Sequence, residues 1–206
     1  MISLFNRNNK LSEEKNSLII TYPRTVSIIF GHYPYPDIIH NFIIDIKNNL
    51  DPKLKNYSNV KGGMTSWFHF LENEMFINFI HYLINKHQNT HSNIFEHFFE
   101  KYFVENAWGN EIMKNDSLNF HDHNCLHGIL YLSKGCDLIV PELNIKITPE
   151  PGDYYIFPAK ILHGFDSYQG ETNRYSLIFN IIEKPNKFNY TKKLDFINEK
   201  YGRKEK

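Results

Sequence analysis

The sequence contains few cysteines, no excess of either charge and no long apolar run, and each shortage excludes a class of protein. Its two cysteines, Cys125 and Cys136, are too few for a disulfide framework and fit a protein whose thiols stay reduced. Lysine plus arginine total 23, and aspartate plus glutamate also total 23. No overall basic field is therefore available to attract nucleic acid, and we expect no nucleic-acid partner.

Targeting and membrane-spanning segments are also missing. Met1-Ile2-Ser3-Leu4-Phe5 is followed at once by polar residues, without the apolar core of a signal peptide. No apolar run approaches the ~20 residues that a membrane-spanning helix needs. These features predict a cytoplasmic protein with no membrane partner, and they leave the oligomeric state open.

The length of 206 residues is most simply that of one domain, and no internal repeat divides it. We expect a lead-in over residues 1–16 and supporting strands and helices over 17–103. A β-rich core should follow over 104–182, and a C-terminal helix and tail over 183–206.

The supporting region predicts three helices. One begins after Asp37, a plausible N-cap. A second runs from Glu72 to about His87, and a third starts at a capping Ser92 and continues through Tyr102. Their apolar residues recur at helical spacing, so we expect them to cover one outer face of a β-sheet. Two strand-like runs, 18–20 and 26–30, precede them and could add strands to that sheet.

Beyond residue 102 the pattern changes to short strand-like runs separated by turns. They cover residues 103–112, 118–123, 127–133, 137–140, 143–148, 154–157 and 173–182. Short strands at this spacing predict an antiparallel sandwich or barrel. The fold class is therefore mainly β with flanking α-helices.

A candidate metal site lies in this second half, at His121-Asp122-His123. In a strand the two histidines project to one side and Asp122 to the other, so two imidazoles could meet one ion. A third ligand is available from His163, which follows a buried strand and Pro158. Further on, Arg174 and Ser176 share one strand face, where a guanidinium and a hydroxyl suit a carboxylate.

Five segments, in this order, carry a resemblance to a known family: Ala107-Trp108-Gly109-Asn110, Asn119-Phe120-His121-Asp122-His123, His127-Gly128-Ile129-Leu130-Tyr131-Leu132, residues 151–163, and Arg174-Tyr175-Ser176-Leu177-Ile178-Phe179-Asn180. Here the chain resembles the iron(II)- and 2-oxoglutarate-dependent oxygenases, in particular a small group found in marine bacteria and their phages. The resemblance covers roughly residues 104–182. It implies a double-stranded β-helix, the cupin-like jelly roll.

The resemblance also implies a chemistry. Fe(II) would be held by His121, His123 and His163, while the far carboxylate of 2-oxoglutarate would bind Arg174 and Ser176. Tyr131 and Asn180 would be further contacts of the co-substrate, and His127 a supporting or substrate-contacting group. The reaction implied is hydroxylation with O2, in which 2-oxoglutarate is oxidatively decarboxylated to succinate and CO2.

Several alternatives stay open. Most members of the superfamily have Asp or Glu where this chain has His123. Asp122 is the alternative carboxylate ligand, but it could join His121 only if the strand is interrupted. The function could instead be that of a three-histidine cupin dioxygenase without 2-oxoglutarate, or of a non-catalytic metal-binding module. The substrate is a small molecule or a peptidyl side chain, contacted by the loops at 51–65, 114–118 and 169–171, none of which carries a specificity motif.

Overall fold

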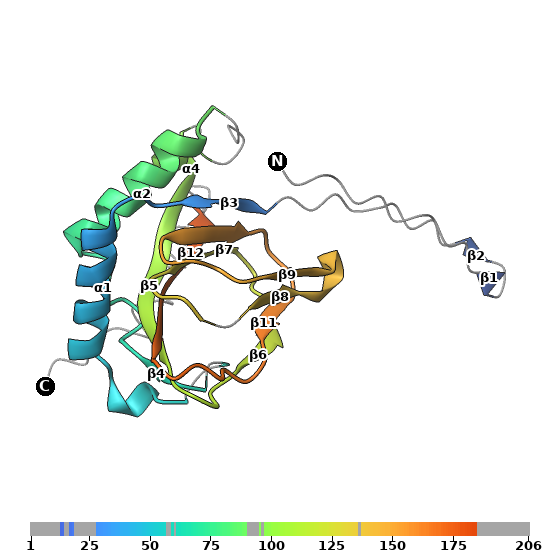
Figure 1. The fold of residues 1–206 in the computed structure, drawn as a ribbon. Helices are drawn as coiled ribbons and strands as arrows, with labels where there is room; N and C mark the ends of the chain where they lie inside the picture. Colours follow the sequence, from blue (N-terminus) through green and yellow to red (C-terminus); the bar gives the residue numbers. More distant parts are fainter. Residues whose placement is uncertain are drawn as a thin grey trace, which may run out of the picture.

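The computed structural model describes residues 13–14, 17–18, 28–56, 59, 61–89, 95, 97–135 and 137–184. Two antiparallel sheets form the body of this part of the chain, with helices along one side (Figure 1). The larger sheet has six strands in the order β3-β10-β7-β12-β5-β4, and the smaller has four in the order β6-β11-β8-β9. Strands β1 and β2 pair only with each other.

The strands are β1 Glu13–Glu14, β2 Ser17–Leu18, β3 Ile29–His32, β4 Gly63–Met64, β5 Tyr102–Ile112, β6 Leu118–His121, β7 Leu126–Tyr131, β8 Leu138–Val140, β9 Ile145–Ile147, β10 Asp153–Phe157, β11 His163–Phe165 and β12 Arg174–Glu183. The helices are α1 Pro36–Asn48, α2 Glu74–His87 and α4 Phe98–Lys101, with short 3-10 turns at η1 Pro52–Leu54 and η2 Pro141–Leu143. None of the helices in these ranges is long and apolar enough to cross a membrane.

The two faces of the large sheet belong to different cores. Helices α1 and α2 pack on the outer face, where Phe42 and Phe79 join Phe179 of β12 in one buried cluster. The inner face carries Trp108 and Ile178, which pack in a second cluster with strand β8 of the small sheet. This arrangement is the predicted double-stranded β-helix, and the predicted helical cover of one sheet face is confirmed.

Helix α1 lies unusually close to β5. A Cβ atom on Gly109 would fall 2.3 Å from Cγ1 of Ile46, so only glycine lets the helix approach this far. The Asp45 carboxylate of α1 also accepts hydrogen bonds from Nε2 of His69 at 2.7 Å and from Nδ2 of Asn73 at 2.9 Å. These contacts tie α1 to both the sheet and the start of α2.

Two helix starts differ from the prediction. Asp37 is not the N-cap of α1, because Tyr35 holds that position and Pro36 follows it. Proline suits the first turn, where its missing N–H would have no partner, and Asp37 then lies within that turn near the positive helix end. Helix α2 begins at Glu74, two residues later than predicted, because the Asn73 side chain accepts hydrogen bonds from the backbone N–H groups of Met75 and Phe76.

The third predicted helix is wrong at its end. Helix α4 stops at Lys101, and Tyr102 already begins β5, where it pairs with Glu183 of β12. The predicted cap Ser92 lies outside the described residues, as does most of the predicted C-terminal helix and tail. Of the two early strand-like runs, the second contributes to β3, which joins the large sheet through β10. Of the first run only Leu18 is among the described residues, and it lies in β2.

Candidate metal centre and carboxylate pocket

Three histidines from two segments of the chain lie close together. His121 ends β6 and His163 begins β11, and the two are register partners in the small sheet. His123 follows β6, and its ring centroid lies 4.8 Å from that of His121 and 5.4 Å from that of His163. One ligand atom from each histidine lies within 4.8 Å of the others. The structure therefore brings together the three candidate ligands named from sequence.

Hydrogen bonds leave the same nitrogen free in two of these rings. Nδ1 of His121 lies 2.8 Å from the carbonyl oxygen of Asn119, and Nδ1 of His163 lies 3.0 Å from that of Ile161. A carbonyl only accepts, so each Nδ1 carries the proton and each Nε2 keeps its lone pair. Nε2 of both His123 and His163 is buried without a hydrogen-bond partner. A divalent transition-metal ion fits this donor set, because it would satisfy the unpaired nitrogens.

The electrostatics keep these imidazoles neutral. Burial, reinforced by the neighbouring histidines, lowers the pKa of His123 to about 3. Burial lowers the pKa of His163 to about 4, and it also lowers the pKa of His121. At neutral pH all three rings are in the form that binds metal.

Asp122 is not among the clustered ligand atoms. Its side chain is exposed, and its carboxylate lies 3.7 Å from Nζ of Lys160. The backbone N–H of Lys160 donates to the carbonyl oxygen of His123 at 2.8 Å, and Lys160 adopts a left-handed φ of 67°. This bond fastens the segment before His163 to the segment carrying His123.

A fourth imidazole supports the cluster. The ring of His127 stacks on that of His123 with centroids 3.6 Å apart and planes 9° apart. Its Nδ1 lies 2.8 Å from Oδ1 of Asn180, so His127 donates to the amide. Burial lowers the pKa of His127, as do His123 and His163. Asn180, predicted as a co-substrate contact, thus lies beside His127, while Ser176 lies further along β12 opposite Tyr131.

The predicted carboxylate-binding residues lie together on the inner face of β12 and β7. Arg174 is 3% exposed, and its guanidinium carbon lies 4.8 Å from the ring centroid of Tyr131 and 4.9 Å from that of Phe165. Ser176, next on the same face, is equally buried. Within the described part of the chain, no ion pair joins Arg174 to a carboxylate, and its Nε has no hydrogen-bond partner. A buried guanidinium without a carboxylate partner is costly, so this site suits an anionic ligand.

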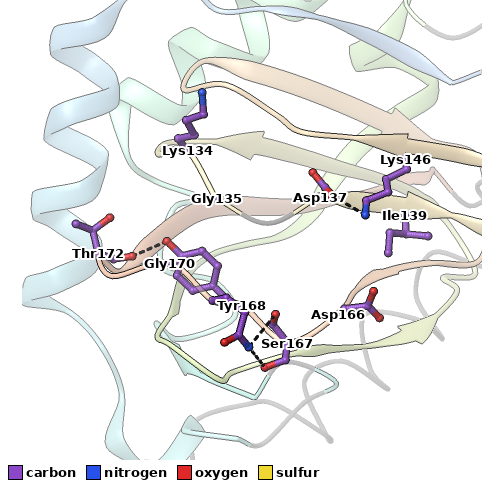
Figure 2. A pocket seen from close by; sticks show the side chains of 11 residues that line it. Lys134, Gly135, Asp137, Ile139, Lys146, Asp166, Ser167, Tyr168, Gly170 and Thr172 are labelled. Atoms are coloured by element: carbon purple, nitrogen blue, oxygen red, sulfur yellow. Dashed lines mark hydrogen bonds and ion pairs between the residues drawn. The ribbon is translucent and has the colours of Figure 1, made fainter.

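A pocket of about 530 Å³ opens between the segment that follows β7 and the loop that precedes β12 (Figure 2). Its lining includes Lys134, Gly135, Asp137, Tyr168 and Gly170, together with Gln169 of the predicted substrate loop at 169–171, but none of the three clustered histidines. A Cβ atom on Gly135 would fall 2.3 Å from Cδ of Arg174, so the pocket wall and the arginine stem are in direct contact there.

Cys125 does not join the metal cluster. It is a free, half-buried thiol. Burial raises its pKa to about 11, so the thiolate that would bind a metal is scarce at neutral pH.

Reading the sequence missed two features of the site. The hydrogen bond between His127 and Asn180 needs the register of β7 on β12, which no local pattern encodes. Polar atoms of Asn106, Trp108 and Asn110 are buried without partners. The alternation Asn-x-Trp-x-Asn in β5 was a usable signal for them, because it puts three hydrogen-bonding side chains on one strand face.

Comparison with solved structures agrees with the class of fold. No protein-family model matches the sequence, and no curated protein matches it significantly. Solved structures that share the architecture include 2-oxoglutarate oxygenases, and the chain has the fold of that class, the double-stranded β-helix.

Three of these structures are similar over most of their length. The viral collagen prolyl hydroxylase of Paramecium Bursaria Chlorella virus-1, solved as a 2-oxoglutarate complex, is 17% identical with a TM-score of 0.56, covering 76% of this chain and 94% of that one. A Pseudomonas putida prolyl-4-hydroxylase is 11% identical with a TM-score of 0.54, covering 77% and 93%. HygX from Streptomyces hygroscopicus, solved with nickel and 2-oxoglutarate, is 10% identical with a TM-score of 0.54, covering 76% and 82%.

Proposed function

We propose that this chain is an Fe(II)- and 2-oxoglutarate-dependent oxygenase that hydroxylates a small molecule or a peptidyl side chain. One observation carries the proposal: the same barrel holds three clustered neutral imidazoles and a buried arginine without a carboxylate partner. The first feature suits a transition metal and the second suits a dicarboxylate co-substrate. The shared fold supports the same assignment.

Each residue has a defined part in this function. His121, His123 and His163 hold the iron, which when bound supplies the activation of O2 and the decarboxylation of 2-oxoglutarate to succinate and CO2. Arg174 binds the far carboxylate through its planar fork, and Ser176 donates its hydroxyl. The rings of Tyr131 and Phe165 keep the guanidinium in place and exclude water from it.

A second candidate follows from the third imidazole. Non-haem iron oxygenases of this class typically use two histidines and one carboxylate, whereas this cluster contains His123. A three-histidine dioxygenase would need no 2-oxo acid, and Arg174 would then bind a carboxylate of the substrate itself. Dependence on 2-oxoglutarate separates the two candidates.

The proposal predicts a specific optical response. Metal-free protein titrated anaerobically with Fe(II) and then 2-oxoglutarate should develop the weak visible charge-transfer band of a chelated 2-oxo acid. His163→Ala should abolish the band because it removes an iron ligand. Arg174→Ala should raise the 2-oxoglutarate concentration for half-saturation about 100-fold, the effect of losing a bidentate charged contact.

Matched controls make the result specific. Lys86→Ala removes an exposed lysine of helix α2, whose Nζ lies over the Tyr82 ring on the outer side of the sheet, and it should leave the titration unchanged. Arg174→Lys keeps the charge but loses the fork, so its affinity should lie between those of wild type and Arg174→Ala. Iron binding without the band would support the three-histidine dioxygenase, and an absence of iron binding would refute the metal site.

A further inference from the structure

The inner face of β5 carries hydrogen-bonding groups that the proposed function does not yet use. Asn106, Trp108 and Asn110 alternate along the strand, and each has a buried polar atom without a hydrogen-bond partner: Oδ1 of both asparagines and Nε1 of the tryptophan. Trp108 belongs to the cluster between the two sheets, so its neighbours two residues away face the barrel interior as well.

Strand register places Asn110 beside the carboxylate pocket. Asn110 pairs with Ser176 of β12, and Ser176 pairs on its other side with Tyr131 of β7. Side chains of directly opposed residues have Cβ atoms about 5 Å apart. Asn110, Ser176 and Tyr131 therefore form one row across three adjacent strands, one step from Arg174 on the same face.

Asn110 is costly where it lies. It is 4% exposed, and a buried amide oxygen without a hydrogen-bond partner destabilises a fold. An apolar side chain of similar size would avoid this penalty. The presence of Asn110 in this row is explained if a bound ligand forms a hydrogen bond with its side-chain amide.

A carboxylate group can be the hydrogen-bond partner of the Asn110 amide. Its two oxygens offer about four lone-pair positions, of which the Arg174 fork fills two and the Ser176 hydroxyl one. One position remains, on the side of Ser176 where Asn110 lies. A half-turn of the terminal amide torsion, which is a broad and soft torsion, presents Nδ2 in place of Oδ1.

We propose that Asn110 is a binding residue for the far carboxylate of 2-oxoglutarate, donating an N–H from Nδ2 beside Arg174 and Ser176. This inference rests on the proposed function. It adds to the pocket an uncharged donor from β5, a strand on which reading the sequence placed no site residue.

The chain supplies a matched control on the same strand. Asn106 is also an asparagine facing the barrel with an unpaired Oδ1, but it pairs with Asn180 at the end where His127 lies. Four residues along a strand separate it from Asn110, roughly 13 Å. A contact with the far carboxylate is beyond its reach.

The test is calorimetric titration of 2-oxoglutarate into anaerobic, Fe(II)-loaded protein. Asn110→Ala should weaken 2-oxoglutarate binding about 10-fold, as expected for one hydrogen bond to a charged group. Asn110→Asp should weaken it about 100-fold or more, because a second carboxylate then faces the first. Asn106→Ala and Asn106→Asp should change the affinity less than about 3-fold.

Three outcomes of this titration would overturn the inference about Asn110. Equal affinities for wild type, Asn110→Ala and Asn110→Asp would overturn the inference while leaving the proposed function intact. An equal loss in Asn106→Asp and Asn110→Asp would also overturn it, because the effect would then be a general one of added charge. Wild-type protein that binds iron but not 2-oxoglutarate would overturn the inference together with the proposed function. Iron stoichiometry and thermal unfolding show which variants are folded, and if Asn110→Asp is not, Asn110→Ala alone decides.

Discussion

In the proposed metal centre, the identity of the third ligand sets the net charge. Three neutral imidazoles leave a bound divalent ion with its full charge of +2, whereas two imidazoles and a carboxylate leave +1. Nε2 of His123 is buried and the ring stacks on that of His127, so little solvent is present at this nitrogen to screen the difference. An anionic co-substrate is attracted more strongly to the three-histidine centre.

Replacing this ligand provides a test at the scale of one residue. His123→Asp should keep one Fe(II) per chain, since two histidines and one carboxylate are an established ligand set for non-haem iron. It should weaken 2-oxoglutarate binding about 10-fold, because about 1.4 kcal/mol of attraction is lost when the centre drops by one charge. Calorimetry of the iron-loaded variant measures the change.

Two variants bracket that result. His123→Ala should lose iron binding, while Asp122→Ala should bind iron like wild type because the Asp122 carboxylate points away toward Lys160. Tight iron and unchanged 2-oxoglutarate binding in His123→Asp would contradict the argument from charge.

Reading the sequence identified the candidate metal ligands but not the groups that hydrogen-bond to them. His121 and His123 could be grouped because alternation along a strand depends only on neighbouring residues. Which carbonyls hold Nδ1 of His121 and His163, and that Asn180 supports His127, depend on contacts between segments. Those contacts have no signature in the local pattern.

At the scale of elements, the close approach of α1 to β5 determines how the helix packs on the sheet. Gly109 of the sheet and Ile46 of the helix interlock, and Ile46 is fully buried. The buried face of α1 and its partner β5 therefore fit as a pair, and a change on one side is felt on the other.

This fit predicts non-additive stability. Gly109→Ala should lower the free energy of unfolding by about 1–3 kcal/mol, because its new methyl group overlaps Ile46. Ile46→Ala alone should cost about 2–5 kcal/mol through the cavity it leaves. The double variant should cost less than the sum of the two, since the smaller side chain makes room for the methyl group.

Urea unfolding of the four proteins measures this coupling. Ile77→Ala, at an exposed position of α2, is the control and should shift stability by less than about 0.5 kcal/mol. Strict additivity of Gly109→Ala and Ile46→Ala would show that the two side chains do not interlock.

Element boundaries show where sequence reading stops. The apolar spacing in residues 74–87 was enough to predict a helix, because its period is a local property. The helix predicted through Tyr102 failed because cross-strand pairing with β12 extends β5 back to that residue. The competition between helix and strand there was decided by a partner about 80 residues away.

For the whole molecule, burying neutral histidines couples stability to pH. Burial lowers the pKa of His163 to about 4 and that of His123 to about 3, while an unfolded histidine titrates near about 6.5. Between these values the unfolded chain binds protons that the folded chain does not. The folded state is therefore most favoured above pH ~6.5 and loses stability as the pH falls below that value.

Metal-free protein should accordingly unfold at a lower urea concentration at pH 5.5 than at pH 7.5. The loss should be at most about 1.4 kcal/mol per pH unit for each buried histidine. His163→Asn removes one of the titrating groups, so its unfolding midpoint should differ less between the two pH values. Identical midpoints for wild type at both pH values would show that the buried rings carry no such penalty.

The fold class was predictable because many short strands separated by turns allow few architectures, and the family-like segments selected one of them. The order of the strands was not, since it requires knowing that β12 lies between β7 and β5. Asn110 escaped notice for the same reason: its neighbour Ser176 is 66 positions away along the chain.

Backbone pairing joins the two segments that carry the three clustered histidines. His121 and His163 are held in register by β6 and β11, and the Lys160 N–H holds the carbonyl of His123. None of these contacts involves an imidazole, so the backbone of the two segments should keep its shape when one of the three histidines is replaced. For the proposed metal site, a substitution at one of the three positions should therefore change the preferred ion and its reactivity, while the backbone preserves the spacing of the other two.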